Sequence, residues 1–407
     1  MKIAVFTDYF FPELGGIQDS IAITARSLGL RGHTIDIHAP RYAAGDYRRV
    51  NASVRDHDLG ANVRIHRSVS LPFPSSTRQS RVALPSPLVL AALSGPARPD
   101  IIHTHSFFGI GLEAVLAGAV FGIHVVGTNH TTIAGFGPHI PVSVDRAAAY
   151  VMWYYNRCDQ VTAPSRSVFE ELGMERLRRP HRVVSNPIDI ALFTSVAEAE
   201  RQELCARFGL PGPTITYAGR LGPEKNIEVI LHAIAALRDQ GIAADLAIAG
   251  HGAHEPMLRA LAAELRIGER VRFLGTLAPE NLARLLQISD IFAMPSTSET
   301  QSMALLQAMA CGAAVVAANS RALPEFVSPD NGVLVELHDS ARLAAAFSEL
   351  LGSPDWRRRL GAAGRRSVER YGVETVTDEW EVLYRSVLDR DQSRERAKGD
   401  QLRGAGV

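Results

Sequence analysis

Short apolar runs alternate with longer amphipathic segments along the whole chain. The short runs are typical of buried strands, and the longer segments, such as 20–32 and 109–122, carry apolar residues at helical spacing. Strands that alternate with helices indicate βαβ units on parallel sheets, so the pattern predicts an α/β fold. The predicted strands lie at 2–10, 33–40, 100–107, 124–130, 158–165 and 182–189, and then at 214–220, 245–252, 270–276, 290–296, 313–319 and 331–337.

Length and pattern together predict two domains. A chain of 407 residues exceeds what one hydrophobic core usually holds, and the alternation runs through both halves. We expect two doubly wound, Rossmann-like domains, 1–195 and 196–372. A helix over 373–390 should return to the first domain, and the charged tail 391–407 should be disordered. Such sheets bind ligands beyond the carboxyl ends of their strands, which predicts two domains facing across a ligand-binding cleft.

Residues 41–90 interrupt the alternation. The segment is proline-rich, which disfavours the interiors of helices and strands. We therefore predict an irregular loop near the mouth of the cleft or on an acceptor-side surface. The "DHD" at 56–58 falls in this segment and is not expected to bind a metal.

Charge and cysteine content narrow the class of protein. The formal net charge is zero, which argues against nucleic acid as a partner, and residues 1–195 carry a small excess of Arg and Lys. Cys158, Cys205 and Cys311 match no metal or disulfide spacing and suit a reducing compartment. The chain opens on a strand rather than a signal peptide, and no apolar run reaches about 18 residues. We expect a cytoplasmic protein, with peripheral membrane contact through the first domain left open.

Lysine is rare in this chain, and Lys225 is the one lysine away from the termini. It follows a predicted strand and a turn, precedes a helix, and lies five residues after Arg220. Such a junction offers free N–H groups and a partial positive charge, and Lys adds a compact charge suited to phosphate. The two cations predict an anion site, the alternative being a solvated surface pair of Glu224 with Lys225.

A second strand–helix junction, "MPSTSETQSMALLQAMACG", carries Glu299. Its carboxylate could stabilise the helix electrostatically, or it could accept hydrogen bonds from sugar hydroxyls. In the second case the backbone N–H groups of residues 300–303 would face a diphosphate. Gln307, two turns further on, would then bond vicinal hydroxyls.

Together these stretches resemble glycosyltransferase family 4, the retaining enzymes of the GT-B fold, over about residues 1–390. The family's fingerprint of "PS", a Glu, seven residues and a second Glu is similar to 295–307, and "AGRLGPEKN" resembles its donor-diphosphate motif. "AIAGHG" and "VRFLGT" resemble its G–G turn and its nucleotide-base loop. "FFPELGGIQ", "GTNHTT" and "SNPID" resemble its glycine loop, the segment with the sugar-facing histidine, and the "PNGVD" before the interdomain linker.

The resemblance implies roles for individual residues. Glu299 would hold the donor hexose, His130 would lie at its 6-hydroxyl side, and Arg220 and Lys225 would neutralise the diphosphate. Gly15 and Gly16 would let the backbone approach the donor. The other implied donor-binding residues are Gly219, Gly250, Gly275, Thr276, Thr300, Gln301, Ser302, Met303 and Gln307.

Three positions depart from the family pattern. Gln307 replaces the second Glu, which loses the charge-assisted strength of a carboxylate–ribose bond and leaves the nucleotide open. Ser302 stands where many members have Gly and should tighten the helix entrance slightly, with a hydroxyl that could cap the helix or bond phosphate. Pro187 stands where Gly is usual.

The implied reaction transfers a hexose from a UDP-glucose-like donor or GDP-mannose to an acceptor hydroxyl, with retention and with no metal or other cofactor. Cations and helix N-termini would supply the electrostatic stabilisation. The "HTH" at 103–105 places two His on one face of a strand without a partnering carboxylate, which favours packing over metal binding. The aromatic helix at 145–158 is expected to be core, or else an apolar wall for the acceptor.

Other functions remain as alternatives. Some nucleotide-sugar epimerases share the architecture but lack this combination of cations with a Glu and a distal Gln, and a nucleotide-sugar-binding protein without turnover is a third interpretation. A nicotinamide dehydrogenase is disfavoured because no G-x-G-x-x-G follows the first strand. "TDYFFPELGGI", "LPFP…RVALP" and "SETQ" resemble the lipid-glycosylating branch, the diacylglycerol glucosyltransferases and phosphatidylinositol mannosyltransferases. The acceptor is therefore predicted to be a membrane lipid, with a polysaccharide or a small molecule as the alternative, and the oligomeric state is not indicated.

Overall fold

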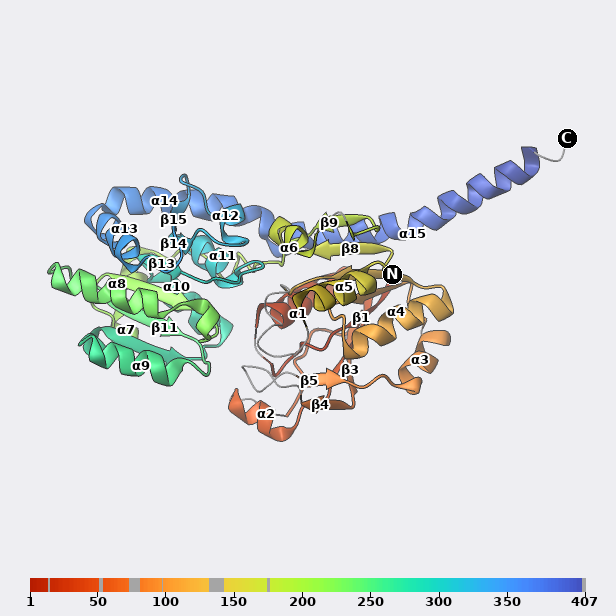
Figure 1. The fold of residues 1–407 in the computed structure, drawn as a ribbon, viewed down its shortest axis with the longest axis horizontal. Helices are drawn as coiled ribbons and strands as arrows, with labels where there is room; N and C mark the ends of the chain where they lie inside the picture. Colours follow the sequence, from red (N-terminus) through yellow and green to blue (C-terminus); the bar gives the residue numbers. More distant parts are fainter. Residues whose placement is uncertain are drawn as a thin grey trace. The chain divides into compact units, whose positions relative to one another are not determined.

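The computed structural model describes residues 1–13, 15–50, 54–72, 81–96, 98–131, 143–173 and 176–404. The chain divides into an N-terminal unit, Met1–Ser185 with Glu374–Val407, and a C-terminal unit, Asn186–Val373. Each unit contains one parallel sheet with helices on both of its faces (Figure 1). The doubly wound α/β fold predicted from the alternation of elements is confirmed.

The N-terminal unit is built on seven parallel strands in the order β3-β2-β1-β6-β7-β8-β9. The chain moves outward from β1 to β3 and then returns to the other side of β1, so the order reverses between β1 and β6. Such a switch point is where doubly wound sheets bind ligands. The strands are β1 (Lys2–Phe6), β2 (Thr34–Pro40), β3 (Val63–Ser68), β6 (Ile101–Thr104), β7 (His124–Thr128), β8 (Gln160–Ala163) and β9 (His181–Val183), with a separate antiparallel pair of β4 (Ser70–Pro72) and β5 (Arg81–Ala83).

Two apolar cores cover the two faces of this sheet. One core joins the sheet to α1, α2 and α15, and the other joins it to α3, α4, α5 and α6. The helices in the described part of this unit are α1 (Gly16–Leu30), α2 (Ala44–Arg49), α3 (Pro87–Ser94), α4 (Gly109–Phe121), α5 (Val144–Tyr155), α6 (Arg166–Leu172) and α15 (Val373–Gly404).

The C-terminal unit is built on six parallel strands in the order β12-β11-β10-β13-β14-β15. Its order reverses between β10 and β13, which places the switch point there. The strands are β10 (Thr214–Ala218), β11 (Asp245–Ala249), β12 (Val271–Gly275), β13 (Ile291–Met294), β14 (Ala314–Ala318) and β15 (Gly332–Val335). The helices are α7 (Glu198–Phe208), α8 (Glu228–Asp239), α9 (Glu255–Glu264), α10 (Pro279–Gln287), α11 (Met303–Ala310), α12 (Leu323–Phe326), α13 (Ser340–Gly352) and α14 (Pro354–Val368), with short 3₁₀ turns η3 (Pro223–Lys225), η4 (Gly268–Arg270) and η5 (Glu369–Tyr371).

All twelve predicted strands are present, and most end earlier than predicted. The prediction of an irregular loop over 41–90 is wrong, because the segment contains α2, the strands β3, β4 and β5, and the first part of α3. In β3 the apolar residues Val63 and Ile65 alternate with Arg64 and His66, as expected of a strand at the edge of a sheet. The prolines lie outside β3, so they do not interrupt its pairing with β2. Residues 73–80 of this segment lie outside the described part of the chain.

The boundary between the units falls at Ser185/Asn186, ten residues before the position expected from sequence. Asn186 already belongs to the C-terminal unit, because its backbone N–H donates to Gln301 Oε1 over 2.7 Å. Ile188 pairs with Gly372 in an isolated bridge, which joins the two ends of the C-terminal unit.

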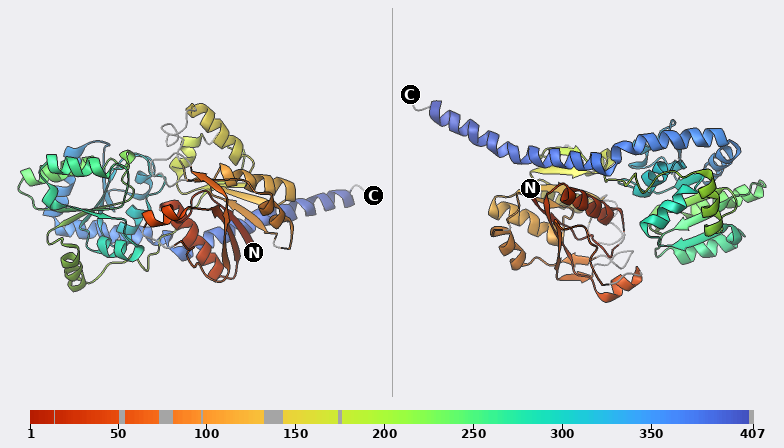
Figure 2. Two further views of the ribbon diagram at one scale, coloured as in Figure 1. Left: turned by 90° about the horizontal axis from the view of Figure 1, so that it is seen from below. Right: turned by 180° about the vertical axis from the view of Figure 1, so that it is seen from behind.

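Helix α15 returns to the N-terminal unit and packs along it (Figure 2). Thr377 Oγ1 donates to Ser27 Oγ over 2.9 Å, and Tyr384 OH lies 2.7 Å from His103 Nδ1. The helix continues to Gly404, where the tail from 391 was expected to be disordered. Residues 391–404 contain no proline and are rich in good helix formers, which permits this continuation; residues 405–407 lie outside the described part.

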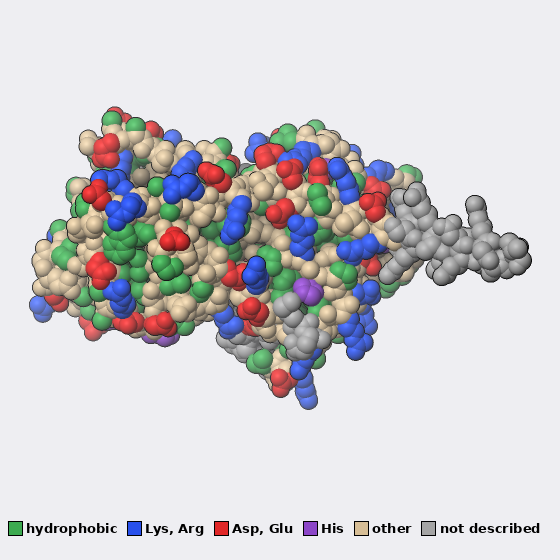
Figure 3. All heavy atoms as spheres, turned by 90° about the horizontal axis from the view of Figure 1, so that it is seen from above, with side chains coloured by type: hydrophobic (Ala, Val, Ile, Leu, Met, Phe, Trp, Pro, Cys, Tyr) green, Lys and Arg blue, Asp and Glu red, His purple; other side chains and the backbone are tan. Residues whose placement is uncertain are grey.

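Surface charge is mixed on the face shown in Figure 3, where Lys and Arg lie interspersed with Asp and Glu. No single-sign patch of the kind that attracts nucleic acid is visible on that face. Within the described residues, no helix has both the length and the apolar character needed to cross a membrane.

Candidate active site

The carboxyl ends of β10, β11 and β12 are tied together by backbone hydrogen bonds. Gly250 N donates to Gly275 O over 2.7 Å, and Gly219 N donates to Ala249 O over 3.0 Å. A Cβ on Gly250 would lie 1.8 Å from Gly219 O, and both glycines have positive φ, 137° and 148°. Only glycine fits there, so the turns after β10 and β11 pack backbone against backbone.

Lys225 and Glu299 form an ion pair between the two strand–helix junctions of the switch point. Lys225 Nζ lies 2.5 Å from Glu299 Oε1, and the two side chains are only 14% and 11% exposed. The turn η3 is also fixed to the end of β13, because Glu224 O accepts from Thr297 N over 2.9 Å and from Thr297 Oγ1 over 3.0 Å. The structure therefore brings together two residues to which the sequence assigned separate roles.

Arg220 lies beside this pair and is more open to solvent. Its guanidinium lies 2.6 Å from Glu224 Oε1, with Arg220 45% exposed and Glu224 28% exposed. Burial alone would raise the pKa of the Glu224 carboxyl, but Arg220, Lys225 and a hydrogen bond from its own backbone N–H hold that pKa below its ordinary value. Glu224 pairs with Arg220, whereas the alternative considered from sequence paired it with Lys225.

The entrance of α11 presents backbone donors, as expected from the sequence. Ser302 is its N-cap, with Oγ accepting from Leu305 N over 3.4 Å, which confirms the predicted capping role. Within the described part of the chain, the N–H groups of residues 299–304 donate no backbone hydrogen bond. These N–H groups give α11 the free donors and partial positive charge that suit an anion.

Three predicted residues of this segment differ in what their side chains do. Gln301 and Met303 are buried, and the Gln301 amide binds the backbone of Asn186. Gln307 is half-exposed, and it shares the open stripe of α11 with Ala304, while the other helical positions are buried. Gln307 is therefore placed to reach a ligand, whereas the Gln301 side chain is already engaged; Thr300 is half-exposed and Thr276 exposed.

His130 follows β7 at the carboxyl edge of the N-terminal sheet. It is 7% exposed, and its Nε2 lies 2.8 Å from His105 Nδ1. Burial lowers the pKa of His130 to about 4 and that of His105 well below its ordinary value, so both rings are neutral near pH 7. One ring must donate to the other, so the tautomer of His130 depends on His105.

His103 lies deeper in the same row and serves packing, as predicted for "HTH". Its Nδ1 contacts Tyr384 OH at 2.7 Å and its Nε2 contacts Thr128 Oγ1 at 2.6 Å. The aromatic helix α5 is core as well, with Tyr154 and Tyr155 fully buried. The described residues contain no group of three or more His, Cys, Asp or Glu able to hold a metal.

Asp8 follows β1 at the same edge and was not singled out by its sequence pattern. Its Oδ1 accepts from Ala83 N over 2.9 Å, while Oδ2 is buried without a partner among the described residues. Burial raises the pKa of Asp8 to about 7, although hydrogen bonds from the backbone of Ala83 and Ile110 oppose the shift. Its position directly after a central strand is the one signal that could have indicated it.

Gly15 and Gly16 begin α1 after β1. A Cβ on Gly15 would meet no atom within 4 Å, so the space beside it is open. Leu14 of the same glycine loop and Thr132 of the "GTNHTT" segment lie outside the described residues.

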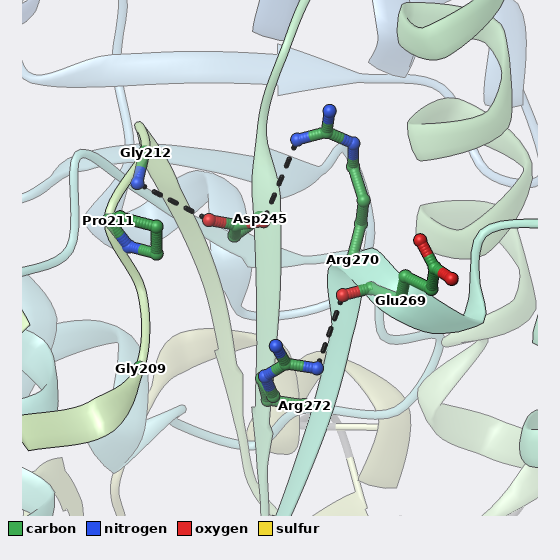
Figure 4. A pocket seen from close by; sticks show the side chains of 7 residues that line it. All are labelled: Gly209, Pro211, Gly212, Asp245, Glu269, Arg270 and Arg272. Atoms are coloured by element: carbon green, nitrogen blue, oxygen red, sulfur yellow. Dashed lines mark hydrogen bonds and ion pairs between the residues drawn. The ribbon is translucent and has the colours of Figure 1, made fainter.

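A surface hollow opens at the opposite, amino-terminal edge of the C-terminal sheet (Figure 4). Asp245 and Arg270 face each other across it at 3.8 Å, and Arg272 donates to Glu269 O over 3.1 Å. Doubly wound sheets bind ligands at their carboxyl edge, so we assign this hollow no part in the site.

Known proteins share this organisation across the whole chain. The model of Glycosyltransferase Family 4 matches residues 14–192, and that of Glycosyl transferases group 1 matches residues 206–367. A GDP-mannose-dependent alpha-mannosyltransferase of Mycolicibacterium smegmatis is 30% identical over 399 residues, which cover 97% of this chain and 100% of the relative. The chain is a family 4 glycosyltransferase.

A second relative agrees with the family, and a solved structure agrees with the fold. An alpha-monoglucosyldiacylglycerol synthase of Streptococcus pneumoniae is 26% identical to this glycosyltransferase, and the match covers 87% of this chain and 79% of the relative. The crystal structure of HepE from Anabaena in complex with UDP superposes with a TM-score of 0.76 at 19% identity, covering 95% of this chain and all of that one. The GT-B fold expected from the sequence is confirmed.

Proposed function

We propose that this glycosyltransferase transfers a hexose from a nucleotide-diphosphate sugar to a hydroxyl of a membrane lipid, with retention and without a metal ion. The observation that carries the proposal is the largely buried ion pair of Lys225 and Glu299, which joins an anion-binding junction to a carboxylate. Lys225 and the free N–H groups at the entrance of α11 suit a diphosphate. Glu299 has a second carboxylate oxygen with which to accept from sugar hydroxyls.

The site residues can be assigned to separate parts of the sugar donor. Arg220 and Lys225 would neutralise the leaving diphosphate, and Gln307, on the open stripe of α11, would bond the ribose. Nε2 of His130 is engaged by His105, so its other ring nitrogen, Nδ1, would be the one that bonds the hexose. The mannosyltransferase relative is named for GDP-mannose and an alpha product; because GDP-mannose is itself an α-linked donor, the same pairing in this chain would mean retention.

A lipid acceptor agrees with the surface of α4. Every exposed position of this helix is apolar, with Leu112, Leu116 and Val120 36%, 51% and 63% exposed. Apart from the buried Glu113, α4 is apolar all round, and such a helix is normally covered. Arg98 caps its C-terminal end, donating to Phe121 O over 2.8 Å, and supplies a cation beside the apolar face. An anionic membrane surface matches both features, and the synthase relative is named for a diacylglycerol product.

The decisive experiment is a donor-by-acceptor screen with the full chain. UDP-glucose and GDP-mannose would each be offered to vesicles with diacylglycerol, vesicles with phosphatidylinositol, and soluble inositol phosphate. We expect a glycolipid with one donor, and an α linkage by NMR. Transfer to the soluble acceptor alone would contradict the lipid assignment, and no transfer or hydrolysis with any donor would contradict the function.

The membrane contact is tested separately by flotation with anionic vesicles. Leu116→Glu should reduce binding, whereas Val382→Glu is the matched control, because Val382 is 56% exposed on α15 over the other face of the sheet. Light scattering tests whether a second copy of the chain, rather than a membrane, covers α4. A dimer of the wild type that Leu116→Glu dissociates would show that a second copy covers α4.

A further inference from the structure

The carboxylate of Glu224 lies in the position of an anion bound by the turn after β10. It contacts the Arg220 guanidinium at 2.6 Å. It also folds against Gly222, since a Cβ there would lie 2.4 Å and 2.6 Å from the two carboxylate oxygens. A guanidinium and a glycine that leaves room are among the features with which turns hold phosphate.

The Glu224 backbone is fixed independently of this carboxylate. Its carbonyl oxygen accepts from Thr297 N, Thr297 Oγ1 and Ser296 Oγ. The side chain can therefore leave Arg220 without releasing the turn. Its 28% exposure gives it a path to solvent.

We propose that Glu224 is an internal competitor of the donor's diphosphate, whose carboxylate occupies Arg220 and the space beside Gly222 and yields both when a phosphate group binds. The inference rests on the proposed function. It makes Glu224 a residue that weakens binding of the donor and of the nucleoside diphosphate product, and so favours product release.

Charge balance supports a competitive role. Arg220 is paired with Glu224 and Lys225 with Glu299, so the two cations are matched by two carboxylates. A diphosphate must draw at least one cation away from its partner. The Arg220 pair is the more exposed one, and such pairs are worth about 0.2–1 kcal/mol, so it is the pair that yields at least cost.

The test is calorimetric titration of the full chain with GDP, UDP and inorganic pyrophosphate at low ionic strength. Glu224→Gln keeps the size of the side chain and removes its charge, and we expect the Kd to fall roughly two- to fivefold, the factor that corresponds to such a pair. The gain should shrink as salt is added. Glu349→Gln is the matched control, because it removes the same charge from the exposed Arg342–Glu349 pair on α13, and it should change nothing.

A steric variant tests the shared space. Gly222 has φ −114°, so Ala is allowed by the backbone. Gly222→Ala should weaken pyrophosphate binding, because the added Cβ excludes phosphate and carboxylate alike. Unchanged affinity in Gly222→Ala would show that phosphate binds elsewhere and would overturn the shared-space assignment.

The outcomes separate this inference from the function on which it rests. Weaker or unchanged binding in Glu224→Gln, with an unchanged unfolding midpoint, overturns the competitor role and makes Glu224 at most a support for Arg220. If the wild type binds a nucleoside diphosphate and Lys225→Ala abolishes that binding, the proposed function stands whichever way Glu224→Gln behaves. If the wild type binds none of the three probes, the proposed function itself fails.

Discussion

The carboxyl edges of the two sheets carry opposite kinds of polar group. At the edge of the N-terminal sheet, His130 and His105 are buried, neutral and bonded to each other. At the edge of the C-terminal sheet, Lys225 and Arg220 are charged and each is paired with a carboxylate. The same doubly wound architecture thus supports a neutral histidine pair at the edge of one sheet and charged ion pairs at the edge of the other.

This difference follows the chemistry that each edge is proposed to serve. A departing diphosphate needs positive charge, whereas sugar and acceptor hydroxyls need donors and acceptors of fixed direction. A charge on His130 would have to be maintained in a buried place, at a cost that neutral imidazole avoids. The comparison can be tested by changing one edge at a time.

Removing a cation from the edge of the C-terminal sheet should have the largest effect on activity. Lys225→Ala removes a cation from the leaving group and leaves Glu299 buried without its partner, and we expect kcat/KM to fall about 100- to 1,000-fold. Steady-state kinetics measures this loss. The double variant Lys225→Ala/Glu299→Gln should recover unfolding free energy relative to Lys225→Ala, because no buried charge is left unpaired, while activity stays low. Near-full activity in Lys225→Ala would remove the charged edge from the reaction.

Protonating His130 at the edge of the N-terminal sheet should lower the free energy of unfolding. The pKa of His130 is lowered to about 4, below the value near 6.5 expected of the unfolded chain. The unfolded state therefore binds the extra proton first, and the contribution of His130 to stability is present above pH 6.5 and is lost as the pH falls towards 4. Each such group changes the unfolding free energy by about 1.4 kcal/mol per pH unit in that window.

Denaturant titrations of wild type and His130→Gln between pH 4 and 7 isolate this term. The difference between the two slopes should correspond to about one proton, whereas equal slopes would mean that His130 is not held neutral. Asp8, with its pKa raised to about 7, acts in the opposite direction, losing stability as the pH rises from about 4 to 7. Asp8 is present in both proteins, so its effect cancels when one slope is subtracted from the other.

Adding a carboxylate on α11, at the edge of the C-terminal sheet, should have a smaller and favourable effect on donor binding. Gln307→Glu restores a carboxylate that can accept from both ribose hydroxyls, and we expect the donor KM to fall by about fivefold or to stay unchanged. The measurement is donor saturation at fixed acceptor. A large increase in KM would show that position 307 does not face the ribose.

The smallest expected effect is that of a chelator. Arg220, Lys225 and the N-terminus of α11 are proposed to supply the positive charge, so EDTA should leave the rate of transfer unchanged. Loss of activity that magnesium or manganese restores would contradict the metal-free mechanism. It would also mean that the cations of the C-terminal edge are insufficient for the diphosphate.

The positions of most strands could be predicted from the sequence, whereas the contacts between distant side chains could not. Strands such as β10 and β13 could be predicted because their burial leaves a local apolar signature. The edge strand β3 was missed because four of its six residues are polar and prolines follow it. The contact between Lys225 and Glu299 spans 74 positions and is created by the pairing of β10 with β13, which no local pattern encodes. The hydrogen bond between His105 and His130 likewise depends on the order of the strands in the sheet.

The return of α15 makes the N-terminal unit discontinuous, which has a consequence for its biogenesis. As the ribosome synthesises the chain, the sheet from β1 to β9 is complete long before Trp380, Tyr384 and Val387 emerge to complete one of its two apolar cores. Domains generally fold in the order of synthesis, but here the first domain must wait for the last helix. The uninterrupted C-terminal unit should be the first to reach its final form, and a nascent chain stalled before Glu374 should expose an uncovered sheet face to chaperones.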